Sequence, residues 1–227
     1  MVKNIVLVHG AFADGSSWAS IIPILHSKGY NVIAVQNPLS SLEDDVAATR
    51  RAIAMMDGPV LLVAHSYGGM VITEAGNDPN VVGLVYVCAL VPDEGQSVND
   101  VIKPYPPSPA VLEFKQDGAG YLTLSAKGVE AHFAQDLPVE TRSTIYSTQT
   151  PWAVQATIQK VSHPAWKTKP SWFIIGEDDQ TVLPALARAE AKMIGATTLE
   201  LNSSHVPMLS QPEKVAAFVI SAAEKVM

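Results

Sequence analysis

Short, nearly continuous hydrophobic runs alternate with segments of helical spacing through the first 91 residues, and the alternation of predicted strands and helices resumes after residue 170. Runs of this kind predict strands that are buried on both faces, as in a parallel sheet with helices on either side. The predicted strands are Ile5–Val8, Val32–Val35, Val60–Ala64, Val81–Cys88, Ser171–Ile175 and Thr197–Leu201. This rhythm predicts the α/β fold class with a doubly wound, mostly parallel sheet.

Helices are predicted between these strands, from apolar residues spaced three and four positions apart. The first follows Ser16–Ser17, ends before Gly29 and shares one apolar face among Trp18, Ile21, Ile22 and Leu25. A second begins near the box Ser40–Glu43 and ends at about Met56, and a third spans about Pro184–Ile194. The last is predicted to open with a capping box at Ser210–Glu213 and to bury Val215, Phe218, Val219, Ala222 and Val226.

The alternation stops between Pro92 and Pro170, a segment that holds nine of the chain's 16 prolines. We interpret residues 92–170 as an inserted, largely helical cap, with helical spacing over Leu137–Lys160 and a short strand at Tyr121–Leu124. The core is then made of residues 1–91 and 171–227, and a chain of 227 residues fits one such shared core.

Composition and charge exclude several classes of protein. A formal net charge of -7, with no basic run, argues against a nucleic-acid partner. The single Cys88 cannot form an internal disulfide, and no residue spacing indicates a metal site or a cofactor. The longest apolar run, Val81–Val91, is shorter than the roughly 18 residues of a membrane span. We expect a cytoplasmic protein without a membrane partner, and the sequence leaves open whether it forms a homodimer.

The most informative stretch is Val63–Gly69, which carries Ser66 between a predicted strand and a predicted helix. A sharp turn at this place would project the serine hydroxyl from the sheet, with the N-terminus of the helix beneath it. Ala64 and Gly68 supply the small neighbours that such a turn needs. The alternative is an ordinary turn in which Ser66 only caps the helix.

Two further polar loops follow predicted strands, and they carry Asp178, Asp179 and His205. Because parallel strands end at one rim, we expect Ser66, one of the two carboxylates and His205 to meet there, in the chain order Ser, Asp, His. A serine hydroxyl needs a histidine to take its proton, and the histidine needs a carboxylate to fix its tautomer. Each residue alone also has a plain structural explanation, as a solvated acid or a packed histidine.

With these features in this order, nearly the whole chain resembles the α/β-hydrolase superfamily. The resemblance rests on His9–Phe12, the turn at Ser66, the acidic loop and Ser204–Leu209. Within the superfamily, Val8–Ala11, Pro92–Asp93 and the tail segment are most similar to the small serine esterases that include plant methylesterases and hydroxynitrile lyases.

The resemblance implies roles for individual residues. It favours Asp179 over Asp178 as the acid of a Ser66, Asp179, His205 catalytic triad, because Gly176-x-x-Asp179-x-x-Val182 matches the family spacing. It places an oxyanion hole on the backbone N–H groups of Ala11 and Tyr67. Phe12, Met208 and Trp152 are candidates for the substrate pocket, and His65 is expected to pack or to form a hydrogen bond away from Ser66.

The favoured function is that of a serine hydrolase of the carboxylesterase type, which cleaves small carboxylic esters through an acyl-enzyme intermediate and needs no cofactor. A hydroxynitrile lyase is one alternative, although the resemblance implies that those lyases carry a lysine directly after the triad histidine, where this chain has Val206. A perhydrolase would use the same residues. A ligand-binding receptor on the same fold is the alternative from another class.

Overall fold

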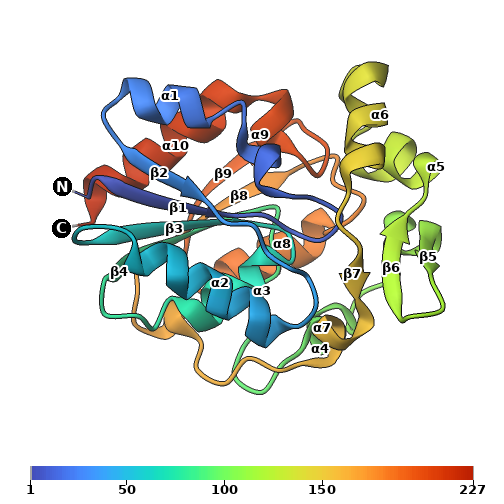
Figure 1. The fold of residues 1–227 in the computed structure, drawn as a ribbon, viewed down its shortest axis with the longest axis horizontal. Helices are drawn as coiled ribbons and strands as arrows, with labels where there is room; N and C mark the ends of the chain where they lie inside the picture. The colour runs from blue at the N-terminus through green and yellow to red at the C-terminus, as the bar shows by residue number, and fades with distance from the viewer. Residues whose placement is uncertain (1, 227) are drawn as a thin grey trace.

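The computed structural model describes residues 2–226, so that Met1 and Met227, the outer limits of the predicted core, lie outside the described residues. Six strands form one sheet in the order β2-β1-β3-β4-β8-β9, and every neighbouring pair is parallel (Figure 1). They are β1 (Asn4–Val8), β2 (Asn31–Ala34), β3 (Val60–His65), β4 (Val81–Val87), β8 (Ser171–Gly176) and β9 (Thr197–Leu201). The predicted fold class is confirmed, and each predicted strand is present with its ends shifted by no more than one residue.

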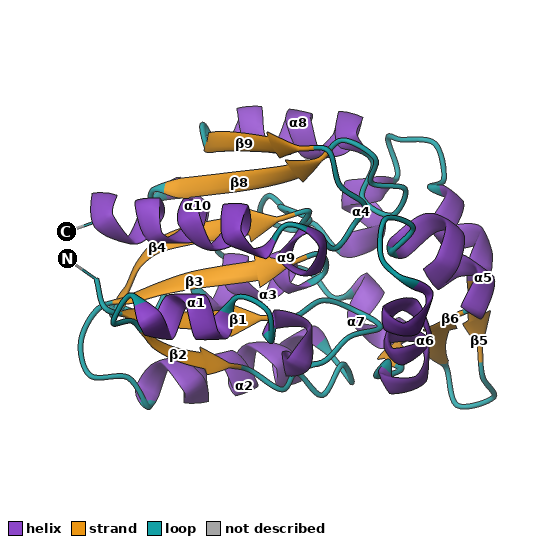
Figure 2. Ribbon diagram, turned by 90° about the horizontal axis from the view of Figure 1, so that it is seen from above, coloured by secondary structure: helices purple, strands orange, loops and turns teal. Residues whose placement is uncertain are grey.

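Helices cover both faces of this sheet (Figures 1 and 2). On one face lie α1 (Ile22–Ser27) and α10 (Pro212–Lys225), with the short α9 (Pro207–Ser210) before α10. The other face carries α2 (Leu42–Ala54), α3 (Gly68–Ala75) and α8 (Pro184–Met193). Since neither face of the central strands meets water, hydrophobic residues are favoured at every position of those strands, which explains their unbroken apolar runs.

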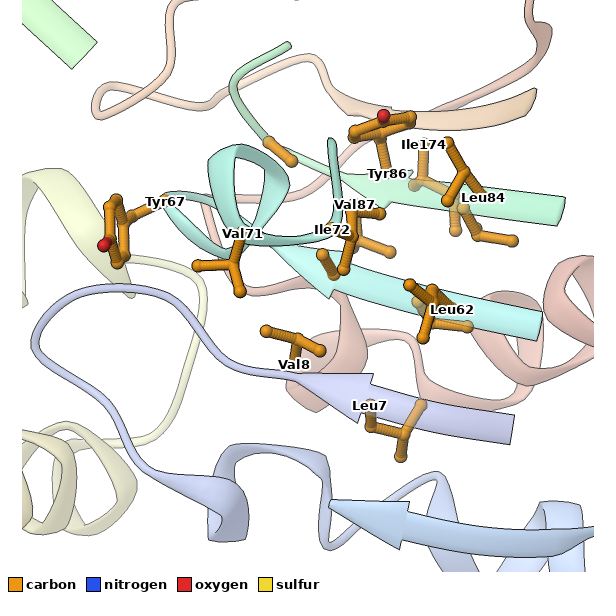
Figure 3. Packing of buried hydrophobic residues seen from close by; sticks show 14 of the residues in the cluster. Leu7, Val8, Leu62, Tyr67, Val71, Ile72, Leu84, Tyr86, Val87 and Ile174 are labelled. Carbon is orange, nitrogen blue, oxygen red and sulfur yellow. The ribbon is translucent and has the colours of Figure 1, made fainter. Parts of the chain in front are cut away.

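The core lies between the central strands and these helices. Every residue of β1, β3 and β8 is buried, whereas the edge strands β2 and β9 are partly exposed. Figure 3 shows Leu62 of β3, Leu84 of β4 and Ile72 of α3 as members of one cluster of buried hydrophobic side chains. Full burial of one such side chain stabilises the fold by roughly 1.5–3 kcal/mol, so this sheet is a rigid base for groups at its rim.

Two predicted helix starts are wrong. The first predicted helix is divided into a 3-10 turn, η1 (Gly15–Trp18), and α1, because Pro23 has no N–H to continue a helix from Trp18 and instead occupies the first turn of α1. The predicted apolar face is nevertheless buried at Trp18, Ile21 and Leu25.

The capping box predicted at Ser210–Glu213 does not form, since Ser210 is the last residue of α9 and Gln211 precedes α10 without a side-chain cap.

Most of the chain between β4 and β8 lies beyond the carboxyl ends of the sheet strands, whereas its last part returns past α3 to the start of β8 (Figure 1). Three short antiparallel strands form a second sheet there, in the order β5-β6-β7, and β6 is the predicted strand Tyr121–Leu124. The elements are α4 (Val98–Ile102), η2 (Pro109–Glu113), β5 (Phe114–Gln116), β6 (Tyr121–Leu124), α5 (Ala126–Gly128), η3 (Val129–Phe133), α6 (Val139–Thr148), β7 (Trp152–Ala153), α7 (Val154–Ile158) and η4 (Ala165–Lys167). Within residues 2–226, no helix has the length and apolar character needed to cross a bilayer.

Candidate active site

Ser66 stands on a tight turn between the end of β3 and the start of α3, with a positive φ of 55°. For a residue with a Cβ this conformation costs on the order of 1–3 kcal/mol, and it persists only where the surroundings determine it. Here the backbone of Ser66 is held on both sides: its N–H donates to the Val87 carbonyl (3.2 Å), and its own carbonyl accepts from the N–H groups of Gly69 (3.0 Å) and Leu90 (3.1 Å).

Close packing around this turn explains the glycines beside it. A Cβ added to Gly68 would lie 2.8 Å from the Val8 carbonyl oxygen, and one added to Gly10 would lie 2.6 Å from the Ser66 Cβ. Both distances are shorter than the contacts that side chains tolerate. The small residue expected two positions after Ser66 is therefore required by the approach of β1 to the turn.

Asp179 and His205 form a buried pair on the loops that follow β8 and β9. His205 Nδ1 lies 2.7 Å from Asp179 Oδ2, and the exposed fractions of the two residues are 0% and 2%. The second carboxylate oxygen accepts from the backbone N–H groups of Thr181 (2.8 Å) and Val182 (3.0 Å). A carboxylate fixed in this way keeps the proton of the imidazole on Nδ1 and leaves Nε2 as the basic nitrogen.

Asp178, the alternative acid, lies elsewhere. Its residue is exposed, and its backbone carbonyl accepts from Gln135 Nε2 at 2.7 Å. The structure therefore brings Asp179, and not Asp178, to His205. Neither Ser66 Oγ nor His205 Nε2 has a hydrogen-bond partner among residues 2–226. Catalytic hydrogen bonds of this kind often tighten only when substrate is bound.

His65 connects the turn to the buried pair. Its Nε2 donates to the backbone carbonyl of His205 at 2.8 Å, and the two imidazole rings lie 4.5 Å apart between centroids. Because a carbonyl only accepts, the proton of His65 is on Nε2, and burial holds the pKa of this ring well below its usual value. The sequence predicted packing or hydrogen bonding for His65 but did not identify His205 as its partner.

Residues 132–136 bind the loops that carry the buried pair. The Ser204 N–H donates to Asp136 Oδ2 at 3.0 Å, and the Thr181 hydroxyl donates to the His132 carbonyl at 2.9 Å. The ring of Phe133 packs on His205, with centroids 4.9 Å apart. Sequence reasoning missed these contacts, which join residues far apart in the chain and leave no local pattern.

The loop after β1 and the turn at Ser66 each hold a backbone N–H group without a hydrogen-bond partner among the described residues. No acceptor among residues 2–226 receives a hydrogen bond from the N–H of Ala11 or of Tyr67. His9 shapes this loop: its Nδ1–H donates to the Gly10 carbonyl (2.8 Å), and its Nε2 accepts from the Asn37 N–H (2.9 Å). Both ring nitrogens are thus occupied in a neutral ring, and burial lowers the pKa of His9.

Tyr67 is held by a buried carboxylate that sequence reasoning did not single out. Its hydroxyl donates to Asp45 Oδ2 (2.7 Å), while Asp45 Oδ1 accepts from the Leu39 N–H (2.8 Å). Burial raises the pKa of Asp45 to about 6 and that of Tyr67 well above its usual value. A pattern pointed to this residue, since Asp45 shares the buried face of α2 with Leu42 and Thr49 at helical spacing.

A cavity of about 310 Å³ lies over Ser66, and none of its lining residues is charged. Phe12 and Trp152, two of the predicted pocket residues, line it together with Ala11 and Tyr67. Met208, the third, is fully buried and lines a smaller neighbouring cavity instead. Among the residues that the structure describes, no group of three or more His, Cys, Asp or Glu side chains could hold a metal ion.

Comparison with known proteins gives concordant results. The sequence model described as "Alpha/beta hydrolase family" matches residues 5–218. The chain is similar to alpha/beta hydrolase nvfD of Aspergillus novofumigatus (29% identity; 96% of each chain) and to methylesterase 8 of Arabidopsis thaliana (22%; 99% of this chain, 91% of the relative). A crystal structure of a pyrethroid hydrolase from Sphingobium faniae shares the fold, with a TM-score of 0.85 at 22% identity over 99% of this chain and 98% of the other.

Proposed function

Because this chain belongs to the alpha/beta hydrolase family and carries a buried Asp179–His205 pair beside the Ser66 turn, we propose that it is a carboxylesterase-type serine hydrolase. It cleaves small carboxylic esters through an acyl-enzyme intermediate on Ser66. The observation that carries the proposal is the 2.7 Å hydrogen bond between His205 and Asp179, because it leaves Nε2 of a buried imidazole free to accept a proton.

In the first half of the reaction, Ser66 Oγ attacks the ester carbonyl carbon while His205 Nε2 takes the hydroxyl proton. The carbonyl oxygen becomes negatively charged, and the N–H groups of Ala11 and Tyr67 stabilise it. Asp179 holds the imidazole in its tautomer and stabilises the imidazolium that forms. The C–O bond to the alcohol then breaks, and His205 donates the proton to the leaving oxygen.

In the second half, a water molecule attacks the acyl-enzyme and gives one proton to His205 Nε2. The new tetrahedral intermediate uses the same two N–H groups. Its collapse breaks the bond to Ser66 Oγ, which takes the proton back from His205, and the carboxylic acid leaves. The enzyme returns to its starting protonation state, so no cofactor is consumed.

The two parts of the chain divide this work. Residues 1–91 and 171–227 form the core that carries the catalytic groups, and residues 92–170 form a cap over the strand ends that carries much of the pocket. The uncharged cavity favours an ester without an ionised group, because burying an unpaired charge there is costly. The methylesterase among the relatives supports an ester as substrate.

The test compares hydrolysis of p-nitrophenyl butanoate by the wild type, by Ser66→Ala and by Ser20→Ala, which removes an exposed hydroxyl that is not part of the cavity lining. We expect Ser66→Ala to lower kcat by at least about 10³-fold and Ser20→Ala to have no effect. A serine-directed phosphonate should add its mass to the Ser66 peptide only. Equal rates for Ser66→Ala and wild type, or an unlabelled Ser66, would contradict the proposal.

A further inference from the structure

A second cavity lies next to the one over Ser66. Its volume is about 130 Å³, and it shares only Phe12 and Phe133 with the larger cavity. The two rings therefore separate a space that contains Ser66 from a space that does not. The smaller space far exceeds the roughly 10–15 Å³ that one water molecule needs, so it has room for part of a substrate.

The residues around His205 line this second cavity. His65 and Phe133, the two rings packed on His205, both contribute to its wall, and so do Val206 and Met208 on the following segment. By contrast, the two free N–H groups of Ala11 and Tyr67 line the larger cavity with Ser66. His205 itself lines neither cavity, but the rings packed on it border the second cavity, whereas the residues of the N–H donors border the larger one.

We propose that the second cavity binds the alcohol part of the ester and the larger cavity its acyl part; this assignment rests on the proposed function. The carbonyl oxygen must reach the N–H groups of Ala11 and Tyr67, which places the acyl carbon and its substituent in the larger cavity. The leaving oxygen must receive its proton from His205 Nε2, which directs the alcohol toward the histidine side.

The chemistry of the lining selects a short, uncharged alcohol. Helix α6 turns one face to this cavity, with Thr141, Thr144, Ile145 and Thr148 at positions i, i+3, i+4 and i+7. The hydroxyls of Thr144 and Thr148 donate to backbone carbonyls one turn earlier (3.0 and 2.9 Å), so neither O–H needs a partner from the substrate. Asp14 is the one carboxylate in the lining, and it disfavours an anionic leaving group.

Phe133 is the fixed part of the wall between the cavities. It ends η3, and two hydrogen bonds hold the segment around it: the His132 carbonyl accepts from the Thr181 hydroxyl, and the Asp136 carboxylate accepts from the Ser204 N–H. Phe12, the other residue that both cavities share, has a backbone conformation with a positive φ of 59°. A substrate that fills both cavities passes between these two rings with its ester group at Ser66.

The experiment measures kcat/KM for butyl butanoate and for methyl butanoate and takes their ratio. Thr144→Phe fills the second cavity from an exposed position of α6, and Ser143→Phe is the matched control, since Ser143 is exposed on the same helix outside the lining. We expect Thr144→Phe to lower the butyl-to-methyl ratio about tenfold, which is typical when a pocket loses room for a few methylenes. Ser143→Phe should leave the ratio within about twofold of wild type.

Three results would overturn the assignment. The ratio could be unchanged in Thr144→Phe, or lowered equally in Ser143→Phe. Alternatively, Thr144→Phe could lower the ratio of methyl octanoate to methyl butanoate, which would place the acyl chain in the second cavity. In each case, loss of all hydrolysis in Ser66→Ala would show that the proposed function still stands; a wild type that cleaves none of these esters would refute both proposals.

Discussion

The parallel sheet and the chain between β4 and β8 are stabilised to different degrees. Every residue of β1, β3 and β8 is buried, whereas α6 contains no buried residue and exposes Val139 and Tyr146. The groups proposed to react all stand on loops at the sheet rim, and the residues proposed to select the substrate come in large part from the other region. Reaction chemistry needs fixed geometry, while a pocket wall tolerates looser packing and more variation in sequence.

The largest effect should come from the carboxylate at the rim. We expect Asp179→Asn to lower kcat by roughly 10⁴-fold, because an amide facing His205 Nδ1 favours the wrong tautomer of the imidazole. Asp178→Asn changes an exposed neighbour and should leave kcat within about twofold of wild type. Steady-state hydrolysis of p-nitrophenyl butanoate distinguishes the two, and similar losses in both variants would remove the special role of Asp179.

The next effect tests packing in the two regions with the same substitution. A Cβ at Gly69, in the first turn of α3, would overlap the Leu90 carbonyl oxygen, whereas a Cβ at Gly118, in the turn between β5 and β6, would have no atom within 4 Å. We expect Gly69→Ala to lower the free energy of unfolding by about 2–4 kcal/mol and Gly118→Ala to change it by less than about 1 kcal/mol. Urea unfolding gives both values; equal values would contradict the contrast between rigid rim and tolerant segment.

A third effect appears in the pH dependence of stability, through Asp45. Its pKa is raised from 3.8 to about 6 by burial, so the folded state holds this proton more tightly than the unfolded state. Stability from this group is complete below the unfolded pKa and is lost as pH rises through the folded pKa. Relative to Asp45→Asn, the wild type should therefore lose about 2–3 kcal/mol of unfolding free energy between pH 4 and pH 7.

The measurement is urea unfolding of both proteins at several pH values, with their difference plotted against pH. Taking the difference removes the carboxylates that titrate equally in both. A difference that stays constant, or that favours the wild type more at pH 7 than at pH 4, would contradict a raised pKa at Asp45.

The parallel sheet could be predicted from the sequence more completely than the chain between β4 and β8. Strands buried on both faces carry unbroken apolar runs, so Val60–His65 could be located from its pattern alone. The exposed edge strand Thr197–Leu201 has no such run and was located from its place after the predicted helix that Gly195 closes. The polar loops at their ends followed, and Ser66 and His205 with them. The two-residue β7 and three-residue β5 are too short to show any period.

The missing parts of the site depend on contacts between distant residues. His65 meets His205 across 140 positions, and Asp136 meets Ser204 across 68. Such pairs form only after the strands are side by side, and no local pattern shows which two residues will meet. Asp45 was also missed, although its place on the buried face of α2 could have identified it as a buried acid.

The smallest effect distinguishes a residue at the sheet rim that positions His205 from a residue between β4 and β8 that contacts the substrate. His65→Leu removes the N–H that donates to the His205 carbonyl while keeping an apolar side chain under the imidazole. We expect kcat to fall about tenfold with KM nearly unchanged, because His205 loses part of its alignment with the reacting atoms. His65→Gln, which retains an N–H donor, should recover much of kcat.

Trp152→Phe is the corresponding change in the chain between β4 and β8, since Trp152 lines the large cavity and packs on Tyr67 with centroids 5.0 Å apart. We expect it to raise KM several-fold through lost contact area, with little change in kcat.

Because burial keeps His65 neutral, neither His65 variant should shift the midpoint of the pH profile of kcat. A shifted midpoint would show that His65 takes part in proton transfer. A change of KM alone in His65→Leu would show that His65 affects substrate binding and does not position His205.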